Sequence, residues 1–281
     1  MQAVWHTNRM KQSAYIFDVD GVLNNLKEYT PDERIILHMA KLLDRGTFVA
    51  INTGRGYEWV KENVVRALRN KVSNAASLSR LFIAAEMGGL AVEFPKGKEE
   101  KRPSAFSLTP DQIARVRQTF EEYPEYIDRV HWYAKQSMAT IDKNTTASME
   151  DFWPVQKELT TLLEKVFEGQ HVKVANSNDA IDVYAPEAGK WAGAQLIYEW
   201  LRRVSDVEHD HFVCFGDSVV DHQMARFFAA QNHDTTFVLT GPTLTGIEPD
   251  DNIILVKTDK PYHEGTYDFL RQYTASGKPA A

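Results

Sequence analysis

Two carboxylates stand at the end of an apolar segment near the start of the chain. Residues 14–17 are apolar, and Asp18 and Asp20 follow one residue apart, with Gly21 directly behind them. Phosphoryl transfer needs a nucleophile, a proton donor for the leaving oxygen, and cations that hold the charge of the phosphate. The two aspartates suit the first two roles, although an isolated pair of this kind is also compatible with two solvated acids at the entrance to a loop.

A second polar run, Thr53, Gly54 and Arg55, follows the apolar segment 48–51. If this run lies beside the first pair, the Thr53 hydroxyl and the backbone amides of the loop can donate hydrogen bonds to a phosphate oxygen. Gly54 and Arg55 are therefore candidate substrate contacts. The alternative interpretation is an ordinary turn between a strand and a helix.

A third apolar segment, 212–215, leads to Asp217, and Asp221 follows in the same polar run. Mg2+ prefers oxygen ligands, usually one or two carboxylates together with water and substrate phosphate. Asp217, Asp18 and the backbone carbonyl of Asp20 would satisfy this preference. Asp221 opens the next predicted helix, so it is either a further residue of the metal site or a cap of that helix.

Lys190 stands at the start of a predicted amphipathic helix, directly after a segment that ends in Gly189. A cation in the first turn opposes the helix macrodipole, so local helix stability does not explain this residue. A ligand for phosphate, or a partner for Asp18, would explain it. The alternative is an ordinary exposed lysine.

The elements that must position these side chains alternate in type. Short apolar segments at residues 14–17, 47–51 and 81–85 alternate with amphipathic stretches at residues 30–45 and 57–69. This order is typical of βαβ units, and uninterrupted apolar strands indicate a parallel sheet that is buried on both faces. In such folds ligands bind beyond the carboxyl ends of the strands. We predict an α/β fold with a doubly wound, Rossmann-like parallel sheet.

The first predicted helix has clear end signals. Thr30 is the expected N-cap, Pro31 occupies the first helical position, Glu33 completes a capping box, and Gly46 follows the last turn. The helix is therefore predicted to cover residues 30–45.

The alternation is interrupted between residues 90 and 184. This part reads as a strand, a helix, two strands, a helix and two strands, which is typical of an open antiparallel sheet with helices on one face. We predict an inserted α+β domain over residues 90–184 and a core formed by residues 1–89 and 185–281.

Composition restricts the class of protein. The chain has 281 residues, of which 43% are hydrophobic and 25% charged, which is ordinary for a globular protein. A formal net charge of -7 argues against a nucleic-acid-binding protein. The one cysteine, Cys214, cannot form an intrachain disulfide and is expected to pack as a small apolar residue. Because no secretion signal or membrane span is recognisable, we expect a cytoplasmic protein without a membrane partner.

Four motifs, taken in order, resemble the signature motifs of the haloacid dehalogenase superfamily of phosphatases. They are FDVDGVL at residues 17–23, NTGR at residues 52–55, Lys190, and GDSVVD at residues 216–221. The insertion after the third core strand is similar to the large αβ cap of sugar-phosphate phosphatases, including sucrose-phosphate, trehalose-phosphate and mannosylphosphoglycerate phosphatases, and to that of phosphomannomutase. The resemblance spans nearly the whole chain.

The resemblance implies a role for each of the two leading aspartates. Asp18 would be the nucleophile, which forms an aspartyl-phosphate, and also a ligand of Mg2+. Asp20 would protonate the leaving oxygen, later activate the hydrolytic water, and contribute to the metal site.

The resemblance also implies how the phosphate and the metal are held. Thr53 would bind the transferring phosphoryl group and Lys190 would neutralise it. Asp217 would bind Mg2+, and Asp221 would help to organise the metal shell.

The predicted cap carries a weaker signal. Residues 131–137 are similar to a cap motif of trehalose-phosphate phosphatases in which glutamate, any residue and lysine precede a serine, but Tyr133 replaces the glutamate. Four polar residues are candidate substrate contacts, each of them also compatible with a solvated strand edge or turn: Lys135, Ser137, Asn176 and Ser177.

These observations favour a Mg2+-dependent phosphatase for a small phosphorylated substrate, a sugar phosphate or similar polar metabolite, over which the cap closes to exclude water. A phosphomutase, which returns the phosphoryl group to a bound sugar, is the alternative, since the four motifs do not separate the two. A non-catalytic binding protein on the same fold is the third hypothesis.

Overall fold

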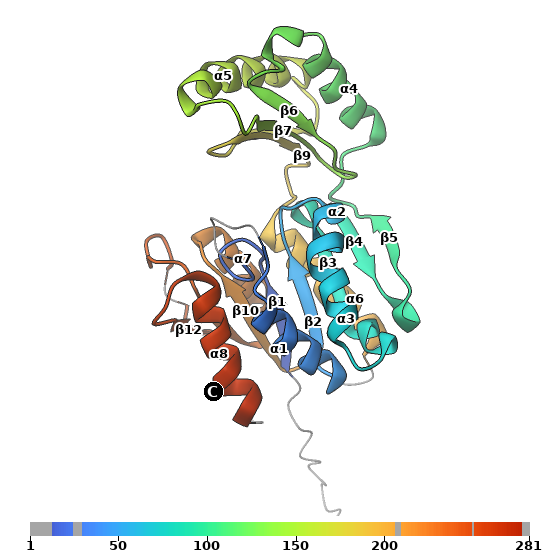
Figure 1. Ribbon diagram of the computed structural model, residues 1–281, viewed down its shortest axis with the longest axis vertical. Helices are drawn as coiled ribbons and strands as arrows, with labels where there is room; N and C mark the ends of the chain where they lie inside the picture. The colour runs from blue at the N-terminus through green and yellow to red at the C-terminus, as the bar shows by residue number, and fades with distance from the viewer. Residues whose placement is uncertain (1–12, 25–29, 206–208, 249, 277–281) are drawn as a thin grey trace, which may run out of the picture.

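The computed structural model describes residues 13–24, 30–205, 209–248 and 250–276. Figure 1 shows two units, a larger one built on an eight-stranded sheet and a smaller one above it. The smaller unit, here called the cap unit, comprises residues 104–189. It lies in the chain between strand β5 (Glu100–Pro103) of the larger sheet and helix α6 (Lys190–Val204). Within the described parts of the chain, no helix combines the length and apolar character needed to cross a bilayer.

The larger sheet has the order β12-β11-β10-β1-β2-β3-β4-β5. The strands from β12 to β3 run parallel, whereas β4 and β5 are antiparallel to their neighbours. The bounds are β1 (Ser13–Phe17), β2 (Phe48–Asn52), β3 (Leu81–Ala85), β4 (Leu90–Glu93), β5 (Glu100–Pro103), β10 (His211–Gly216), β11 (Asp234–Leu239) and β12 (Ile253–Lys257).

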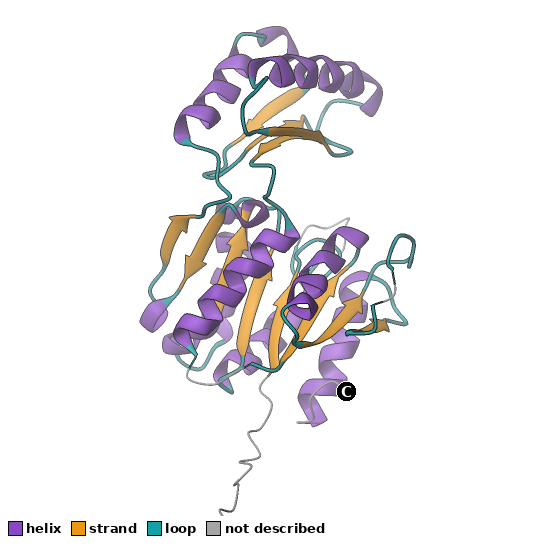
Figure 2. Ribbon diagram, turned by 180° about the vertical axis from the view of Figure 1, so that it is seen from behind, coloured by secondary structure: helices purple, strands orange, loops and turns teal. Residues whose placement is uncertain are grey.

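Helices cover both faces of this sheet, which confirms the predicted doubly wound α/β fold (Figures 1 and 2). Alternate residues of β1 point to opposite faces, so Phe17 packs into one hydrophobic cluster and Ile16 into the other. One face carries α1 (Glu33–Asp44), α2 (Tyr57–Val60), a π-helical turn (Lys61–Val65), α3 (Arg66–Lys71) and α8 (Tyr262–Ser276). The other face carries α6 (Lys190–Val204) and α7 (Val219–Ala230). Cys214 is buried there among apolar side chains, as expected.

The cap unit has its own four-stranded antiparallel sheet in the order β6-β7-β9-β8. Its helices α4 (Pro110–Glu121) and α5 (Met149–Val166) lie on the face away from the larger sheet (Figures 1 and 2). Its strands are β6 (Val130–Tyr133), β7 (Ala139–Lys143), β8 (Lys173–Asn176) and β9 (Ala180–Tyr184). A separate hydrophobic cluster fills the space between these two layers. Short 3₁₀ turns occur in both units at Ala75–Arg80, Glu86–Gly88, Pro95–Gly97 and Pro124–Tyr126.

The structure differs from the predicted insertion at its first boundary. Strand β4 pairs with β3, and β5 pairs with β4, so residues 90–103 belong to the larger sheet and not to the inserted unit. The chain reverses tightly at Gly88 and Gly89, so that β4 returns antiparallel along the edge of β3.

The first helix also begins differently from the prediction. The N-cap of α1 is Asp32, whose carboxylate accepts a hydrogen bond from the Arg34 backbone N–H at 2.8 Å, so the assignment of Thr30 as N-cap was wrong. Pro31, directly before this N-cap, forms an isolated antiparallel bridge with Asn24. Gly46 follows the helix with a φ of 86°, as its predicted role requires.

The separate cluster of the cap unit predicts separate unfolding. Leu159→Ala removes a fully buried side chain from this cluster and should destabilise the cap unit by about 2–5 kcal/mol. Amide hydrogen exchange should accelerate in α5 and β7 while β1 and β10 stay protected. Equal loss of protection in all four elements would show that the two units unfold as one.

Candidate active site

The polar residues at the strand ends meet at one edge of the larger sheet. Strand β1 lies between β2 and β10, and all three are parallel, so their carboxyl ends are neighbours. The Asp18 backbone N–H donates to the Phe215 carbonyl at 3.0 Å, and the Thr53 N–H donates to the Ala84 carbonyl at 3.0 Å. These bonds continue the strand pairing by one residue and fix the two side chains at the sheet edge.

Lys190 joins this edge from the first turn of α6. Its Nζ lies 2.5 Å from Asp18 Oδ1 and 2.8 Å from Asp221 Oδ1, and it donates to the Asn52 carbonyl at 2.8 Å. In return Asn52 Nδ2 donates to the Lys190 carbonyl at 2.8 Å. Gly193 makes this approach feasible, because a Cβ there would collide with the Asn52 amide. Lys190 is therefore a buried partner of Asp18 and not a surface lysine.

Asp221 caps helix α7, one of the two roles that the sequence left open, and it also pairs with Lys190. Its Oδ1 pairs with Lys190, while its Oδ2 accepts hydrogen bonds from the backbone N–H groups of Asp217 and Ser218, each at 3.1 Å. The Ser218 hydroxyl also donates to Oδ2 at 2.7 Å, which completes a capping box at the start of α7. Both carboxylate oxygens of Asp221 therefore already have partners, and the residue holds Lys190 and the first turn of α7 together.

The charges of this cluster fit a divalent cation. Oxygen atoms of Asp18, Asp217 and Asp221 lie within 4.8 Å of one another. Burial raises the pKa of Asp18 to about 8, although Lys190 acts in the opposite direction. Burial and the Asp221 carboxylate raise the pKa of Asp217 to about 7. Lys190 therefore does not fully compensate the carboxylates, and a hard cation that prefers oxygen ligands, such as Mg2+, matches the donor set.

Glycines allow this close packing of acids. Gly21 has a φ of 70°, and a Cβ at this position would collide with the Asp217 carboxylate. A Cβ at Gly216 would likewise collide with the side chain of Asp221. The glycine in the first motif thus permits two strand ends to approach, in addition to turning the chain.

Asp20 is held by an arginine of the second motif. Arg55 Nη2 donates to Asp20 Oδ1 at 2.6 Å and Arg55 Nε donates to Asp20 Oδ2 at 2.8 Å. The guanidinium lies 4.0 Å from the ring centre of Trp59, which restricts its orientation. The Arg55 backbone N–H donates to Thr53 Oγ1 at 3.1 Å. One loop therefore positions the hydroxyl, the arginine and, through the arginine, the carboxylate of Asp20.

A cavity of about 590 Å³ lies between this edge and the cap unit. Six of the predicted site residues, Asp18 among them, contribute to its wall on the larger unit, and its wall on the cap unit is polar. The core side consists of Asp18, Asp20, Thr53, Gly54, Arg55, Gly56, Trp59, Met87 and Lys190, and the cap side of Tyr133, Lys135, Asp142, Asp179 and Asp182. The carboxyl end of β2 faces the cap unit, as Figure 1 shows. The predicted metal residues Asp217 and Asp221 do not line the cavity.

Lys135 is the predicted cap residue that the structure brings to the cavity. Its Nζ donates to the Gly54 carbonyl at 3.2 Å and lies 3.7 Å from Asp182 Oδ1. Beside it, Tyr133 packs against Gly56, where a Cβ would lie 3.0 Å from the tyrosine ring. The segment around Lys135 thus contacts the loop of the second motif directly.

The other three predicted cap contacts do not line the cavity. The Ser137 hydroxyl is buried and donates to Glu86 Oε2 at 2.8 Å. Asn176 is exposed and accepts a hydrogen bond from the Thr160 hydroxyl of α5 at 2.8 Å. Ser177 is exposed in the turn between β8 and β9 and donates to Asp179 at 3.3 Å.

Several residues of the site had not been singled out from the sequence. Asp142 and Asp182 lie on the face of the cap sheet opposite the cap helices. Because successive side chains of a strand point to opposite faces, the alternation in β7 and β9 could have indicated them. On β7 the side chains of Ala139 and Ile141 are buried, so the alternating polar positions must face the other way. Asn52 was part of a recognised motif, but its bond to Lys190 depends on tertiary contact.

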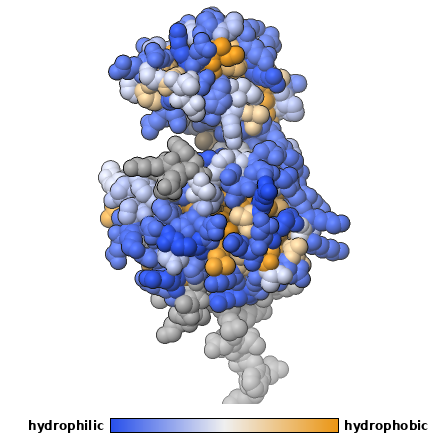
Figure 3. Space-filling view, in the orientation of Figure 1, coloured by the Kyte–Doolittle hydropathy of each residue, from blue (hydrophilic) through white to orange (hydrophobic). Residues whose placement is uncertain are grey.

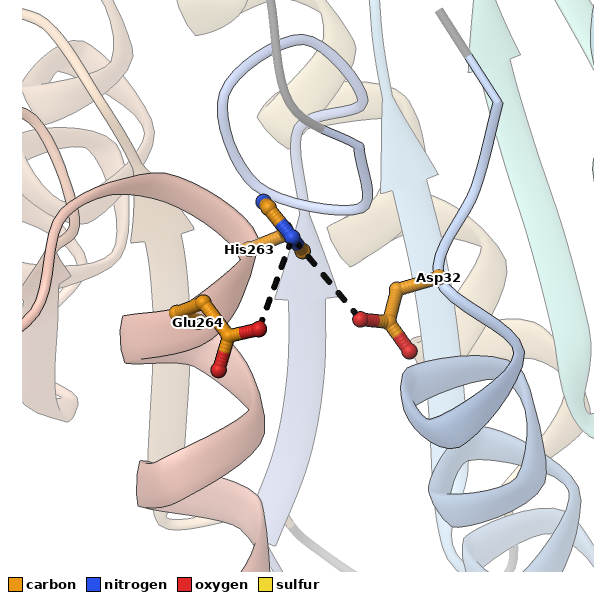
Figure 4. Close-up of side chains that lie close together, drawn as sticks. All are labelled: Asp32, His263 and Glu264. Carbon is orange, nitrogen blue, oxygen red and sulfur yellow. Dashed lines mark ion pairs between the residues drawn. The ribbon is translucent and has the colours of Figure 1, made fainter. Parts of the chain in front are cut away.

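A second acidic group, shown in Figure 4, has a structural role. His263 Nε2 lies 3.9 Å from Asp32 Oδ2 and 3.7 Å from Glu264 Oε1. Arg34 Nη2 lies 2.5 Å from the same Asp32 oxygen and 2.6 Å from the same Glu264 oxygen. The guanidinium already compensates both carboxylates, so this group joins the starts of α1 and α8 and has no need of a metal ion.

On the face shown in Figure 3, the described residues are mainly hydrophilic, with small separate apolar patches on both units.

The raised pKa of Asp217 makes stability depend on pH and on metal. Without a cation, the folded protein binds a proton at Asp217 between about pH 4 and about pH 7 that the unfolded chain has released, so the free energy of unfolding falls as pH rises through this range. Asp217→Asn should make this decline shallower, and Mg2+ at about 100 times its Kd should stabilise the parent protein by about 2.7 kcal/mol. Urea denaturation across pH, with EDTA or with Mg2+, measures both effects.

The matched control for this experiment is Asp251→Asn, which changes an exposed aspartate outside the cluster. It should leave both the pH dependence and the Mg2+ effect as in the parent protein. A parent protein whose stability does not respond to Mg2+ at any pH would contradict the assignment of a metal site.

Comparisons with known proteins agree with this arrangement at the level of the fold. The sequence matches no protein-family model, and no curated protein is significantly similar to it in sequence. The C-terminal domain of trehalose-6-phosphate phosphatase from C. albicans is similar in structure, with 16% identity, coverage of 94% of this chain and 92% of that chain, and a TM-score of 0.65. Trehalose-6-phosphate phosphatase from Aspergillus fumigatus has 17% identity, coverage of 95% and 93%, and a TM-score of 0.54.

A haloacid dehalogenase-like hydrolase from Bacteroides thetaiotaomicron is similar as well. It shares 12% identity with this chain, the alignment covers 93% of this chain and 99% of that chain, and the TM-score is 0.60. At such low identities the likeness concerns the fold, and it extends over both the larger unit and the cap unit because nearly the whole chain is covered. The chain therefore has a haloacid dehalogenase-like fold with an inserted α+β unit, as its four motifs predicted.

Proposed function

We propose that this protein is a Mg2+-dependent phosphatase that hydrolyses a phosphate monoester through a covalent aspartyl-phosphate on Asp18. The observation that carries the proposal is the position of Asp18, a buried carboxylate paired with Lys190 at 2.5 Å, at the wall of a polar cavity. Trehalose-6-phosphate phosphatases and a haloacid dehalogenase-like hydrolase share the fold, which supports the same reaction class.

The reaction uses the residues at the edge of the sheet. A carboxylate oxygen of Asp18 attacks phosphorus, the bond to the leaving oxygen breaks, and Asp20 supplies the proton that this oxygen needs. Water then attacks phosphorus while Asp20 accepts its proton, the bond between phosphorus and the Asp18 oxygen breaks, and inorganic phosphate leaves with the Asp18 carboxylate regenerated. The Thr53 hydroxyl and Lys190 hold the oxygens of the phosphoryl group throughout.

The metal site would consist of Asp18, Asp217 and the backbone carbonyl of Asp20. Mg2+ bound there would offset the negative charge of the phosphate. Lys190 would keep the Asp18 carboxylate in place through their ion pair, and Asp221 would hold Asp217 through its backbone N–H. Lys190 and Asp221 are also paired with each other.

Arg55 must change partners for Asp20 to act. Its guanidinium binds both oxygens of Asp20, and a carboxylate held in this way cannot donate a proton. The planar guanidinium also matches the geometry of phosphate oxygens. We infer that substrate phosphate takes over Arg55 and so releases Asp20 for proton transfer.

The residues of the cap unit that line the cavity favour a substrate with a polar leaving group. Lys135, Asp142 and Asp182 offer both donors and acceptors opposite the phosphate site, and a cavity of about 590 Å³ has the size of sites that enclose small molecules. A sugar or similar polyhydroxy compound matches this lining because its hydroxyl groups can bond to carboxylates and to the lysine. We therefore propose a sugar phosphate as the substrate.

The nucleophile is tested with Asp18→Asn. This variant cannot form the covalent intermediate, so Mg2+-dependent release of phosphate from 4-nitrophenyl phosphate should fall by about 10³-fold or more. Asp44→Asn is the matched control, because the Asp44 carboxylate accepts hydrogen bonds from the Ser73 N–H outside the cavity. Undiminished turnover in Asp18→Asn would refute the mechanism. Interconversion of hexose monophosphates faster than phosphate release would instead identify a mutase.

The proton donor is tested with Asp20→Asn and two leaving groups. A sugar alkoxide needs protonation as it leaves, so turnover of a sugar phosphate should fall by about 10²–10⁴-fold. The nitrophenolate ion leaves without a proton, so the first step with 4-nitrophenyl phosphate should slow by less than about tenfold, even though hydrolysis of the aspartyl-phosphate, which also uses Asp20, slows for both substrates. Equal losses in the first step for both substrates would assign Asp20 to another role. The first step is measured as the rate of release of sugar or nitrophenol in a single turnover at saturating Mg2+.

A further inference from the structure

Glu86 is a buried carboxylate that joins the two units. It is 1% exposed and lies in the turn after β3. Its Oε2 accepts hydrogen bonds from the backbone N–H of Gln136 at 2.8 Å, from the backbone N–H of Ser137 at 2.7 Å, and from the Ser137 hydroxyl at 2.8 Å. Its Oε1 accepts a further bond from the Tyr57 backbone N–H at 3.3 Å.

The backbone around Glu86 is tied to the phosphate-binding loop and to α6. The Glu86 N–H donates to the Arg55 carbonyl at 3.1 Å, and the Met87 N–H donates to the Thr53 carbonyl at 3.0 Å. The Met87 carbonyl in turn accepts a bond from Gly189, the residue before Lys190, at 2.7 Å. This turn therefore contacts two loops that carry the residues proposed to bind phosphate.

The turn adopts a conformation that side chains rarely take. Glu86 has a φ of 54° and Met87 a φ of 58°, in the left-handed region that costs free energy for residues other than glycine. Gly89 follows, and a Cβ there would collide with the Ser137 hydroxyl. Such a turn persists only when the surrounding contacts hold it, and the bonds to the cap unit are among these contacts.

The cap segment bonded by Glu86 is the one that reaches the cavity. Lys135 directly precedes Gln136, and its Nζ donates to the Gly54 carbonyl at 3.2 Å. Tyr133, two residues further back, also lines the cavity. Fixing the backbone at residues 136 and 137 therefore fixes the direction from which both side chains enter the site.

We propose that Glu86 is a positioning residue that sets Lys135 and Tyr133 against the phosphate-binding loop and so determines recognition of the leaving group. The inference rests on the proposed phosphatase function. Glu86 does not line the cavity, so it acts through the cap segment and not by contact with substrate. Loss of its bonds should weaken binding of substrates that need the cap wall, and should spare substrates that use the phosphate site alone.

The test uses Glu86→Gln in the full-length protein. Glutamine keeps the shape of glutamate but places an N–H₂ group where one carboxylate oxygen meets backbone donors. The KM for the best sugar phosphate should rise by about tenfold, with a smaller change in kcat, whereas kcat/KM for 4-nitrophenyl phosphate should change by less than about threefold. Amide hydrogen exchange at Gln136 and Ser137 should accelerate in the same variant.

The control is Glu93→Gln. Glu93 is also a buried carboxylate of the larger sheet, but its partners are Arg102 and Arg203 and not the cap unit. This variant should lose stability without separating the two substrates and without faster exchange at residues 136 and 137. Ser137→Ala, which removes one of the bonds to Glu86, should give a smaller rise in KM that does not add to that of Glu86→Gln.

The outcomes separate this inference from the proposed function. A parent protein that hydrolyses neither substrate refutes the phosphatase proposal, while amide exchange at Gln136 and Ser137 still reports on the role of Glu86. An active parent with equal losses on both substrates in Glu86→Gln, or with unchanged exchange at these two amides, overturns the positioning role.

Discussion

The buried ion cluster around Lys190 is the interaction on which the arrangement of the site depends. Charges removed from water are tolerated only when they are paired and hydrogen-bonded. Lys190 meets this condition by bonding to Asp18, to Asp221 and to the Asn52 carbonyl. These partners come from β1, from the start of α7 and from the end of β2. Four segments that are distant in sequence must therefore meet before any of these charges can be buried, which couples formation of the fold to formation of the site.

The core of the site was largely predictable because its geometry follows from sheet topology. Asp18, Thr53 and Asp217 directly follow buried parallel strands, and parallel strands end at a common edge. The pairing of Arg55 with Asp20 was not predictable in the same way. It depends on the rotamer of the long Arg55 side chain and on its contact with the ring of Trp59. Neither the hydrophobic periodicity nor the spacing of the motifs contains that information. The N-cap of α1 was misplaced for a similar reason, since Pro31 is engaged in a tertiary bridge with Asn24 and Asp32 caps the helix instead.

The cap unit was predictable in architecture but only partly in function. Its helices and strands follow from hydrophobic periodicity, whereas its boundary and its contacts follow from packing against the larger unit. The exposed position of Asn176 and the burial of Ser137 against Glu86 could not be read from polarity, because both residues have the chemistry of substrate contacts. Asp142 and Asp182 show the converse case, since the alternation along their strands could have indicated the cavity side although no motif contains them.

The connection between the cap unit and α6 has a mechanical consequence. Strand β9 ends at Tyr184 and α6 begins at Lys190, so residues 185–189 form the covalent link between the last strand of the cap unit and the buried lysine. Gly189 has a φ of 151°, which suits glycine, and a Cβ at this position would meet open space. Its N–H is nevertheless anchored to the Met87 carbonyl at 2.7 Å. Rotation must therefore be absorbed on the cap side of this anchor, within residues 185–188, so that the cap unit can move while the ammonium group of Lys190 stays in place.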